Sequence, residues 1–180
     1  MPDLKIALIQ NEQAWEDIDA NLKLFGIAVD GVTSDTDLIV LPEMFTTGFT
    51  MNAADLAKDM EGSGVLWLKD TARRKSVDLV GSLIIRENGC YYNRLVWMKP
   101  DGRFWTYDKR HLFRMAGEHH VYTAGNHPIT VDVNGWRLRP FICYVMSAST
   151  SITLSCATTS ITVIVIYNRN HQPGHCPGRY

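Results

Sequence analysis

Three side chains that could carry chemistry each lie where an apolar, strand-like stretch ends. Glu43 closes "DLIVLPE" (37–43), Lys109 lies within "YDKRHLF" (107–113), and Cys143 lies within "FICY" (141–144). A carboxylate can move protons, an ammonium can stabilise negative charge, and a thiol can act as a nucleophile. Residues that follow buried strands also tend to face clefts. The three positions are therefore candidates for a catalytic site.

Each of these residues also has a purely structural interpretation when it is taken alone. Glu43 could be a solvated glutamate at a strand end, although Pro42 fixes the approach of the chain in a way that suits a carboxylate facing a cleft. Lys109 is ambiguous by itself. Cys143 could be a small buried hydrophobic side chain, as isolated cysteines often are. The local sequence leaves both interpretations open.

Composition excludes several classes of protein. The chain has 180 residues, of which 46% are hydrophobic and 21% charged, and its net charge is −1. This profile is typical of one soluble globular domain, or part of a larger one, and does not favour nucleic acid or an anionic membrane as a partner. We see no secretory signal and no apolar run of membrane-spanning length. Four cysteines at irregular spacings favour a reducing compartment, so we expect a cytoplasmic protein.

The hydrophobic pattern predicts alternating strands and helices, followed by a series of strands. We expect buried strands at 4–10 and 37–43, and helices within 16–32 and 62–77. A meander with strands at 78–86, 90–98 and 103–107 should follow, and then a hairpin over 127–144 that turns at Asn134-Gly135. This order indicates an α/β sandwich in which helices cover a mixed sheet.

Other side chains receive structural interpretations. His111, His119, His120 and His127 match no zinc-binding spacing, so we expect no metal site. The aromatic residues are expected in the core or as pocket lining; they are Phe45, Trp97, Trp105 and Trp136. Tyr92, Asn93 and Arg94, in "YYNRLVWM", are assigned a structural role.

The motifs around the three candidates, taken in order, resemble the nitrilase superfamily of carbon–nitrogen hydrolases. The matching segments are "LIVLPEMF", "YDKRHLF" and "ICY", and the opening "KIALIQ" is similar to that family's first strand. "FTTGFTMNA" and "RHLFRMAGEHHVYTAG" look most like the omega-amidase branch, whose members release ammonia from the terminal amide of 2-oxo acids. The resemblance covers roughly residues 4 to 144. It implies a nitrilase-like α-β-β-α sandwich, of which only the first part is present.

The resemblance also assigns roles within a Glu-Lys-Cys triad. Glu43 matches the general base, Lys109 the cation that stabilises the oxyanion, and Cys143 the nucleophile that forms a thioester acyl-enzyme. Glu118 matches a second glutamate beside the lysine that helps to position the substrate, and Tyr144 is expected to support the site. The resemblance implies a small-molecule amide as substrate, no cofactor and no metal. A homodimer like that of the family is compatible with it.

The sequence departs from the family pattern directly after Tyr144. The family continues with Asp, then Leu or Val, then Arg-Phe-Pro, whereas this chain continues with Val145-Met146-Ser147. All nineteen acidic residues lie in 1–144, and ten Ser or Thr fall within 147–162. Codons for Val-Met-Ser-Ala-Ser can contain Asp-Val-Arg-Phe in a shifted reading frame. We therefore divide the chain into a nitrilase-like part, 1–144, and an anomalous tail, 145–180, that is not native family sequence.

Three functional hypotheses are compatible with these motifs and with the altered tail. The first is a cysteine-dependent amidase of the omega-amidase type that acts on a small carboxylated amide. The second is an inactive truncated fragment or pseudoenzyme of the same family. The third keeps the triad but changes the reaction to that of a nitrilase or a carbamoyl-amide hydrolase.

Overall fold

Two amphipathic helices of equal length form the outer layer. The computed structural model describes residues 3–142, 154–156 and 159–166. Helix α1 (Ile18–Asp30) begins where the side chain of Asp17 accepts a hydrogen bond from the Ala20 amide, which satisfies one of the free N–H groups of the first turn. Helix α3 (Ser63–Lys75) carries three basic residues in its last turn, where they complement the helix dipole.

The first sheet has the order β1-β2-β3-β4-β5. Strands β1 (Ile6–Leu8), β2 (Leu38–Val40) and β3 (Asp78–Glu87) are parallel, whereas β4 (Cys90–Met98) and β5 (Phe104–Asp108) are antiparallel to their neighbours. The β3–β4 turn places Asn88 at φ 50° and Gly89 at φ 77°. Positive φ at both central residues is the requirement of a two-residue hairpin turn, and Asn-Gly meets it at low cost.

A second sheet has the order β6-β7-β9-β8. Strands β6 (Val131–Val133) and β7 (Trp136–Ile142) form the hairpin predicted at Asn134-Gly135. Strand β9 (Thr159–Ile166) is parallel to β7, and β8 (Leu154–Cys156) is antiparallel to β9. Both β8 and β9 fall within the segment 145–180, so part of this segment is paired in a sheet.

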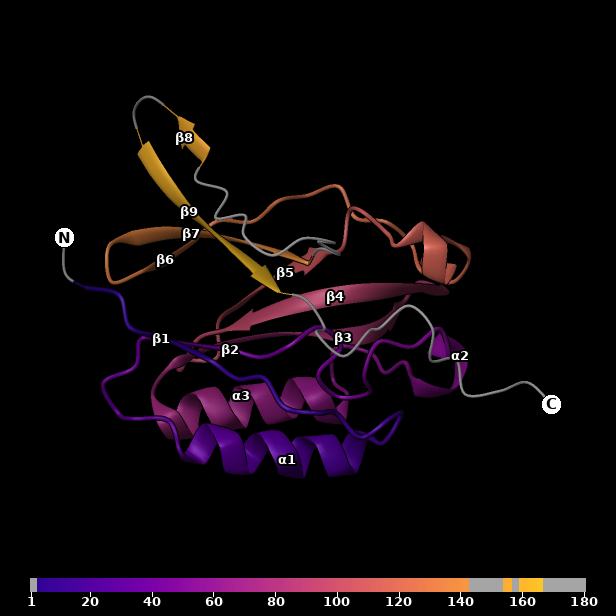
Figure 1. Cartoon of the computed structure of the whole chain (residues 1–180), viewed down its shortest axis with the longest axis horizontal. Helices are drawn as coiled ribbons and strands as arrows, with labels where there is room; N and C mark the ends of the chain where they lie inside the picture. Colours follow the sequence, from indigo (N-terminus) through magenta and orange to yellow (C-terminus); the bar gives the residue numbers. More distant parts are fainter. Residues whose placement is uncertain (1–2, 143–153, 157–158, 167–180) are drawn as a thin grey trace.

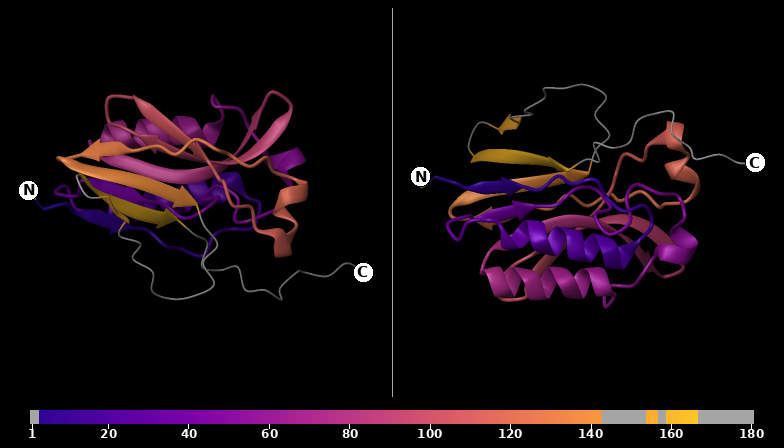
Figure 2. Two further views of the ribbon diagram at one scale, coloured as in Figure 1. Left: turned by 90° about the horizontal axis from the view of Figure 1, so that it is seen from above. Right: turned by 60° about the horizontal axis from the view of Figure 1, so that its bottom comes forward.

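The elements form helix–sheet–sheet layers (Figures 1 and 2). Helices α1 and α3 cover one face of the first sheet, around a core that includes Phe25, Leu68 and Leu79. The second sheet covers the other face, where Trp97 and Leu95 pack with residues of β6, β7 and β9. This is the first part of the predicted α-β-β-α sandwich, and the predicted fold class is confirmed.

Short helical turns lie in the loops that the hydrophobic pattern left unassigned. They are α2 (Ala53–Leu56) and the 3₁₀ turns η1 (Arg114–Ala116) and η2 (Glu118–His120). They enclose a third apolar cluster that includes Met44, Phe49 and Tyr122. In the described part of the chain, none of the helices combines the length and the apolar character needed to cross a membrane.

Candidate active site

Glu43 lies in a tight turn that follows β2. The chain leaves the sheet with a hydrogen bond from the Leu41 amide to the Val80 carbonyl, 2.8 Å long. The next residue after Glu43, Met44, has φ 46°, a left-handed conformation that is strained for a side chain of this size. The Met44 amide donates to Ser82 Oγ at 2.8 Å, and Gln13 Nε2 donates to the Met44 carbonyl at 2.9 Å. These bonds hold the turn that presents Glu43.

Lys109 follows the last residue of β5 and is fixed through its backbone on both sides. Its amide donates to the Asn93 carbonyl at 2.9 Å, and its carbonyl accepts from the Gly125 amide at 3.0 Å. Gly125 lies so close to β5 that a Cβ atom there would come within 2.3 Å of the Asp108 carbonyl oxygen. The glycine therefore permits the loop after η2 to pack against the backbone that carries Lys109.

Glu118 begins η2, directly after Gly117, whose φ is 74°. One of its carboxylate oxygens, Oε2, accepts a 2.5 Å hydrogen bond from the Phe113 amide. The Tyr122 hydroxyl, one turn further along, donates to the Thr50 carbonyl at 2.7 Å and so connects this segment to the loop after Glu43. Glu118 is completely buried.

The structure brings Glu43, Lys109 and Glu118 into one buried ion cluster. Lys109 Nζ lies 2.7 Å from Glu43 Oε1 and 2.9 Å from Glu118 Oε2. The exposed fractions of the three residues are 4%, 1% and 0%, in the order Glu43, Lys109, Glu118. Buried charges are costly unless they are paired and hydrogen-bonded. Two carboxylates on one ammonium are a specific arrangement, which distinguishes this Glu43 from a solvated strand-end glutamate.

Asn93 completes the cluster, although its sequence context predicts only a structural role. Its Nδ2 donates to Glu43 Oε1 at 2.7 Å and to Glu118 Oε1 at 3.3 Å. Asn93 lies in β4 opposite Ile84, one residue before the Arg94–Asp108 pair. Nothing in the sequence around it indicates that its side chain reaches the two glutamates. The contribution of Asn93 to the site is therefore visible only in the folded chain.

Burial and the neighbouring charges together shift the pKa values of Glu43 and Lys109. Burial raises the pKa of the Glu43 carboxyl above its usual range, although Lys109 and the Asn93 hydrogen bond oppose this shift. Burial acts to lower the pKa of the Lys109 ammonium, but the attraction of Glu43 and Glu118 outweighs it, and that pKa is raised. The arrangement therefore keeps Lys109 positive and makes Glu43 a stronger base than an exposed glutamate.

The remaining two predicted site residues, Cys143 and Tyr144, lie outside the described residues. Strand β7 ends at Ile142, the residue that precedes Cys143 in the sequence. Among the aromatic residues, Phe45 and Trp97 are buried in the core, as predicted. In the ranges that the structure describes, no three His, Cys, Asp or Glu side chains are grouped so that they could hold a metal ion.

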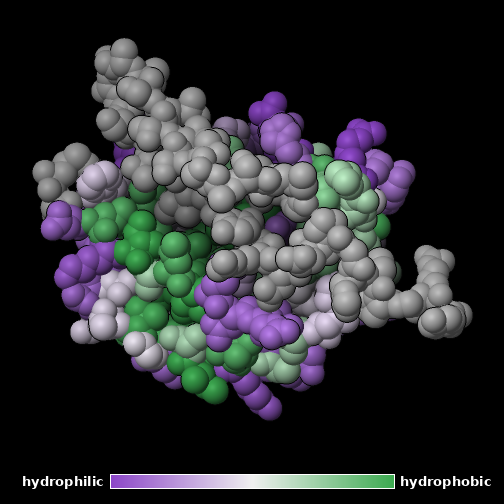
Figure 3. Space-filling view, in the orientation of Figure 1, coloured by the Kyte–Doolittle hydropathy of each residue, from purple (hydrophilic) through white to green (hydrophobic). Residues whose placement is uncertain are grey.

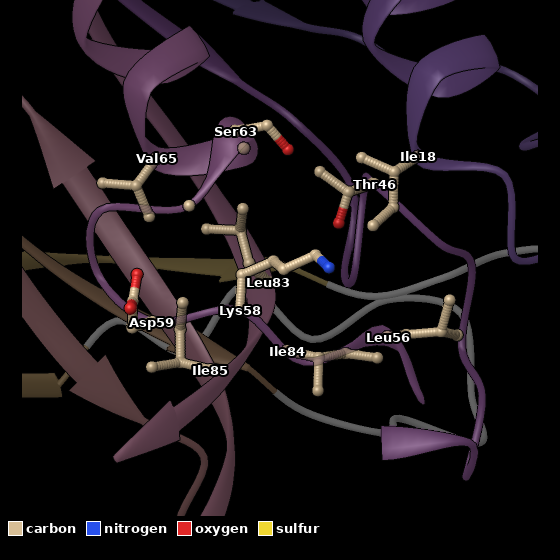
Figure 4. Close-up of a pocket in the computed structure, with 12 residues that line it drawn as sticks. Ile18, Thr46, Leu56, Lys58, Asp59, Ser63, Val65, Leu83, Ile84 and Ile85 are labelled. Atoms are coloured by element: carbon tan, nitrogen blue, oxygen red, sulfur yellow. The ribbon is translucent and has the colours of Figure 1, made fainter. Parts of the chain in front are cut away.

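A small pocket lies elsewhere, between α3, β3 and the loop after α2 (Figure 4). Its lining includes Thr46, Lys58, Ser63 and Leu83, and in Figure 4 the Lys58 side chain extends across it. None of Glu43, Lys109 and Glu118 lines this pocket. The pocket therefore belongs to the packing of α3 and not to the candidate active site.

Comparison with known protein families shows which family the chain belongs to. The profile of the family described as "Carbon-nitrogen hydrolase" matches residues 5–177. The chain belongs to the carbon–nitrogen hydrolase family. The match includes Glu43, Lys109 and Glu118 and extends through β8 and β9.

Among curated proteins, the chain is similar to two that are named as amidases. The chain is 44% identical over 146 residues to omega-amidase YafV of Escherichia coli K12, covering 80% of this chain and 56% of that protein. It is 30% identical over 142 residues to 2-oxoglutaramate amidase of Bacillus subtilis, covering 77% and 55%. The chain therefore spans about half the length of the curated relatives that it matches.

Solved structures agree with the fold. XC1258 of Xanthomonas campestris, described as a CN-hydrolase superfamily protein with an arsenic adduct in the active site, is 41% identical with a TM-score of 0.77; the match covers 80% of this chain and 54% of that one. An amidase from Nesterenkonia sp. has a TM-score of 0.69 at 23% identity, over 78% of this chain and 56% of its own. The second match supports the fold alone.

Proposed function

We propose that the chain hydrolyses the carbon–nitrogen bond of a small carboxylated amide and releases ammonia, with Glu43, Lys109 and Cys143 as the catalytic residues. The observation that carries the proposal is the buried contact of 2.7 Å between Lys109 Nζ and Glu43 Oε1, with Glu118 on the same ammonium. The similarity to an omega-amidase and to a 2-oxoglutaramate amidase supports the substrate class.

Glu43 is the general base in this proposal. The hydrogen bonds that its carboxylate accepts from other described residues fall on Oε1, so we assign proton transfer to Oε2. Glu43 takes the thiol proton of Cys143, and the sulfur attacks the amide carbon to form a tetrahedral intermediate. The same proton then passes to the leaving nitrogen, the C–N bond breaks, and ammonia departs from the thioester.

In the second half of the reaction, water hydrolyses the thioester and Glu43 again transfers the proton. Glu43 removes a proton from a water molecule, the resulting hydroxide attacks the thioester carbon, and the C–S bond breaks as the proton returns to the thiol. Lys109 supplies the fixed positive charge that stabilises the oxyanion in both halves. Glu118 holds the ammonium in place from the other side. A raised Glu43 pKa suits a group that must both accept and return a proton.

The test is ammonia release by the full chain from a small carboxylated amide. Replacing Cys143 with Ala should abolish release and leave the thermal unfolding transition unchanged. Release that persists in Cys143→Ala would overturn the assignment of the nucleophile. Assays with the corresponding nitrile and carbamoyl-amide distinguish the amidase from the two other reactions of this family.

A second candidate is an inactive member of the family, favoured by the departure from the family pattern after Tyr144. In this case the ion cluster would be intact but no amide would be cleaved. An electrophilic amide analogue would then leave Cys143 unlabelled, whereas the amidase labels it. The irregular cysteine spacing further leads us to propose a reducing compartment, the cytoplasm, as the location.

A further inference from the structure

Asn93 closes a ring of hydrogen bonds around the ion cluster. Its Nδ2 donates to one oxygen of each carboxylate, Glu43 Oε1 and Glu118 Oε1. Lys109 Nζ bridges the same two residues on the other side of the ring. The ring therefore runs from Glu43 through Lys109, Glu118 and Asn93 back to Glu43. The Glu43 carboxylate is held by these two partners, and the Glu118 carboxylate by these two and by the Phe113 amide, so neither can rotate freely.

The orientation of the Asn93 amide follows from its surroundings. An ionised carboxylate can only accept hydrogen bonds, so the NH₂ group and not the carbonyl must face Glu43 and Glu118. The opposite orientation would bring a carbonyl oxygen against two carboxylates. The orientation that results leaves Asn93 Oδ1 buried without a hydrogen-bond partner in the described part of the chain.

An unpaired buried acceptor is a cost that native proteins avoid. Asn93 is 1% exposed, so bulk solvent does not reach this side chain. A residue kept only for packing in β4 would need no polar side chain at this position. The cost is instead offset by the two hydrogen bonds to the carboxylates, which indicates that the position serves the site.

We propose that Asn93 is a positioning residue for amide hydrolysis: it holds Glu43 Oε1 and Glu118 Oε1 together so that Glu43 Oε2 faces the reacting groups. The inference rests on the proposed function, because it takes Glu43 as the general base. Asn93 touches neither substrate nor nucleophile in this role. It acts by fixing the rotation of the carboxylate and by favouring its ionised form, since a donated hydrogen bond stabilises negative charge.

Two variants separate this role from a structural one. Asn93→Ala removes the donor, so ionised Glu43 loses stabilisation and the acid limb of the kcat/KM profile should move to higher pH by about one unit. The kcat value should fall about ten- to a hundredfold with little change in KM, because the base is misplaced but binding is not. Asn93→Asp keeps the shape and adds a third carboxylate, so its acid limb should move further in the same direction.

Asn52→Ala is the matched control. Asn52 Nδ2 also donates to a glutamate carboxylate, Glu16 Oε2 at 3.2 Å, but outside the cluster. Its loss should lower the melting temperature slightly and leave the pH profile in place. If Asn93→Ala fails to fold, the isosteric Asn93→Asp carries the test.

A second readout does not depend on turnover. The Glu43 carboxyl band in infrared difference spectra, identified by its loss in Glu43→Gln, reports the protonation of Glu43 directly. We expect its titration to move to higher pH in both Asn93 variants and to stay in place in Asn52→Ala. If the wild-type chain releases no ammonia but the Asn93 variants show this shift, the proposed function is refuted, while the hold of Asn93 on the Glu43 carboxylate is supported. An unshifted Glu43 titration in folded Asn93→Ala and Asn93→Asp would overturn that role.

Discussion

The environment of Glu43 raises the pKa of its carboxyl and so disfavours the charged form. Burial raises the pKa of this carboxyl, and the neighbouring Glu118 raises it further, while Lys109 and Asn93 lower it. A base must be ionised to accept a proton, so a raised pKa moves the onset of activity to higher pH. The same shift makes the protonated form available for transfer to the leaving nitrogen.

This environment leads to a prediction about pH dependence. The kcat/KM for amide hydrolysis should fall as the pH falls through the Glu43 pKa, at a pH above the pKa of an exposed glutamate. Below that pH Glu43 is protonated and cannot take the thiol proton. Glu43→Gln should lower kcat by at least about a hundredfold at every pH. An acid limb that persists in Glu43→Gln with activity retained would show that another group is the base.

Lys109 is the sole ammonium between two buried carboxylates in the described cluster. Lys109→Met removes the only positive charge there and leaves Glu43 and Glu118 facing each other. We expect a loss of about 3–5 kcal/mol in the free energy of unfolding, measured by urea denaturation at neutral pH. The loss should shrink as the pH falls, because protonation of a carboxyl relieves the repulsion.

Lys23→Met is the control for this change, since Lys23 is exposed on α1. Its effect should remain within about 0.5 kcal/mol. Equal effects of the two substitutions would contradict the buried ion cluster.

At the scale of elements, β3 and β4 carry the site. The turn with Glu43 is tied to β3 through Ser82, whose Oγ and carbonyl accept from the Met44 and Phe45 amides. Strand β4 supplies Asn93, and its pairing with β5 places Lys109 beside it. The long β3–β4 hairpin is therefore the rigid support from which the flanking loops present the charged groups.

Gly125 offers a test of this arrangement. In Gly125→Ala the new Cβ would clash with the Asp108 backbone, so the end of β5 and Lys109 must shift. We expect amide hydrolysis to fall at least about tenfold, together with a lower melting temperature.

The matched substitution is Gly26→Ala in α1, where a Cβ would meet nothing within 4 Å. Alanine stabilises the interior of a helix relative to glycine, so this variant should gain about 0.5–1 kcal/mol in the free energy of unfolding and retain its activity. Full activity in Gly125→Ala would indicate that the loop after η2 does not fix Lys109.

Much of this support could be predicted from local sequence. The Asn134-Gly135 turn, the helices within 16–32 and 62–77 and the strands of the meander each depend on neighbours in the chain, and the structure agrees with them. Asn93 and the short turns η1 and η2 were missed for the opposite reason. Asn93 meets Glu43 across fifty positions of sequence, so its role depends on tertiary packing that no local pattern encodes.

On the scale of the whole molecule, one sheet edge carries exposed apolar side chains. Strand β1 is an edge of the first sheet, and its Leu8 is 74% exposed. Figure 3 shows hydrophobic side chains gathered on the face seen there. Open edges and apolar surface favour association with other chains. The chain spans about half the length of the curated relatives it matches.

The segment 145–180 gives a prediction about the gene. We propose that it is read in a shifted frame, so the nucleotide sequence around codon 144 should hold a second open frame that encodes Asp-Val-Arg-Phe after Tyr144. Expression of that frame should give a chain with a more cooperative thermal transition. A gene without this second frame would refute the shift.

Intact-protein mass spectrometry of the chain mixed with a carboxylated amide tests the central claim most directly. We predict an acyl adduct that peptide mapping places on Cys143, that hydroxylamine removes as it does a thioester, and that is absent in Cys143→Ala and slowed in Glu43→Gln. Ammonia release without any adduct, or an adduct on another residue, would contradict a thiol nucleophile served by Glu43 and Lys109.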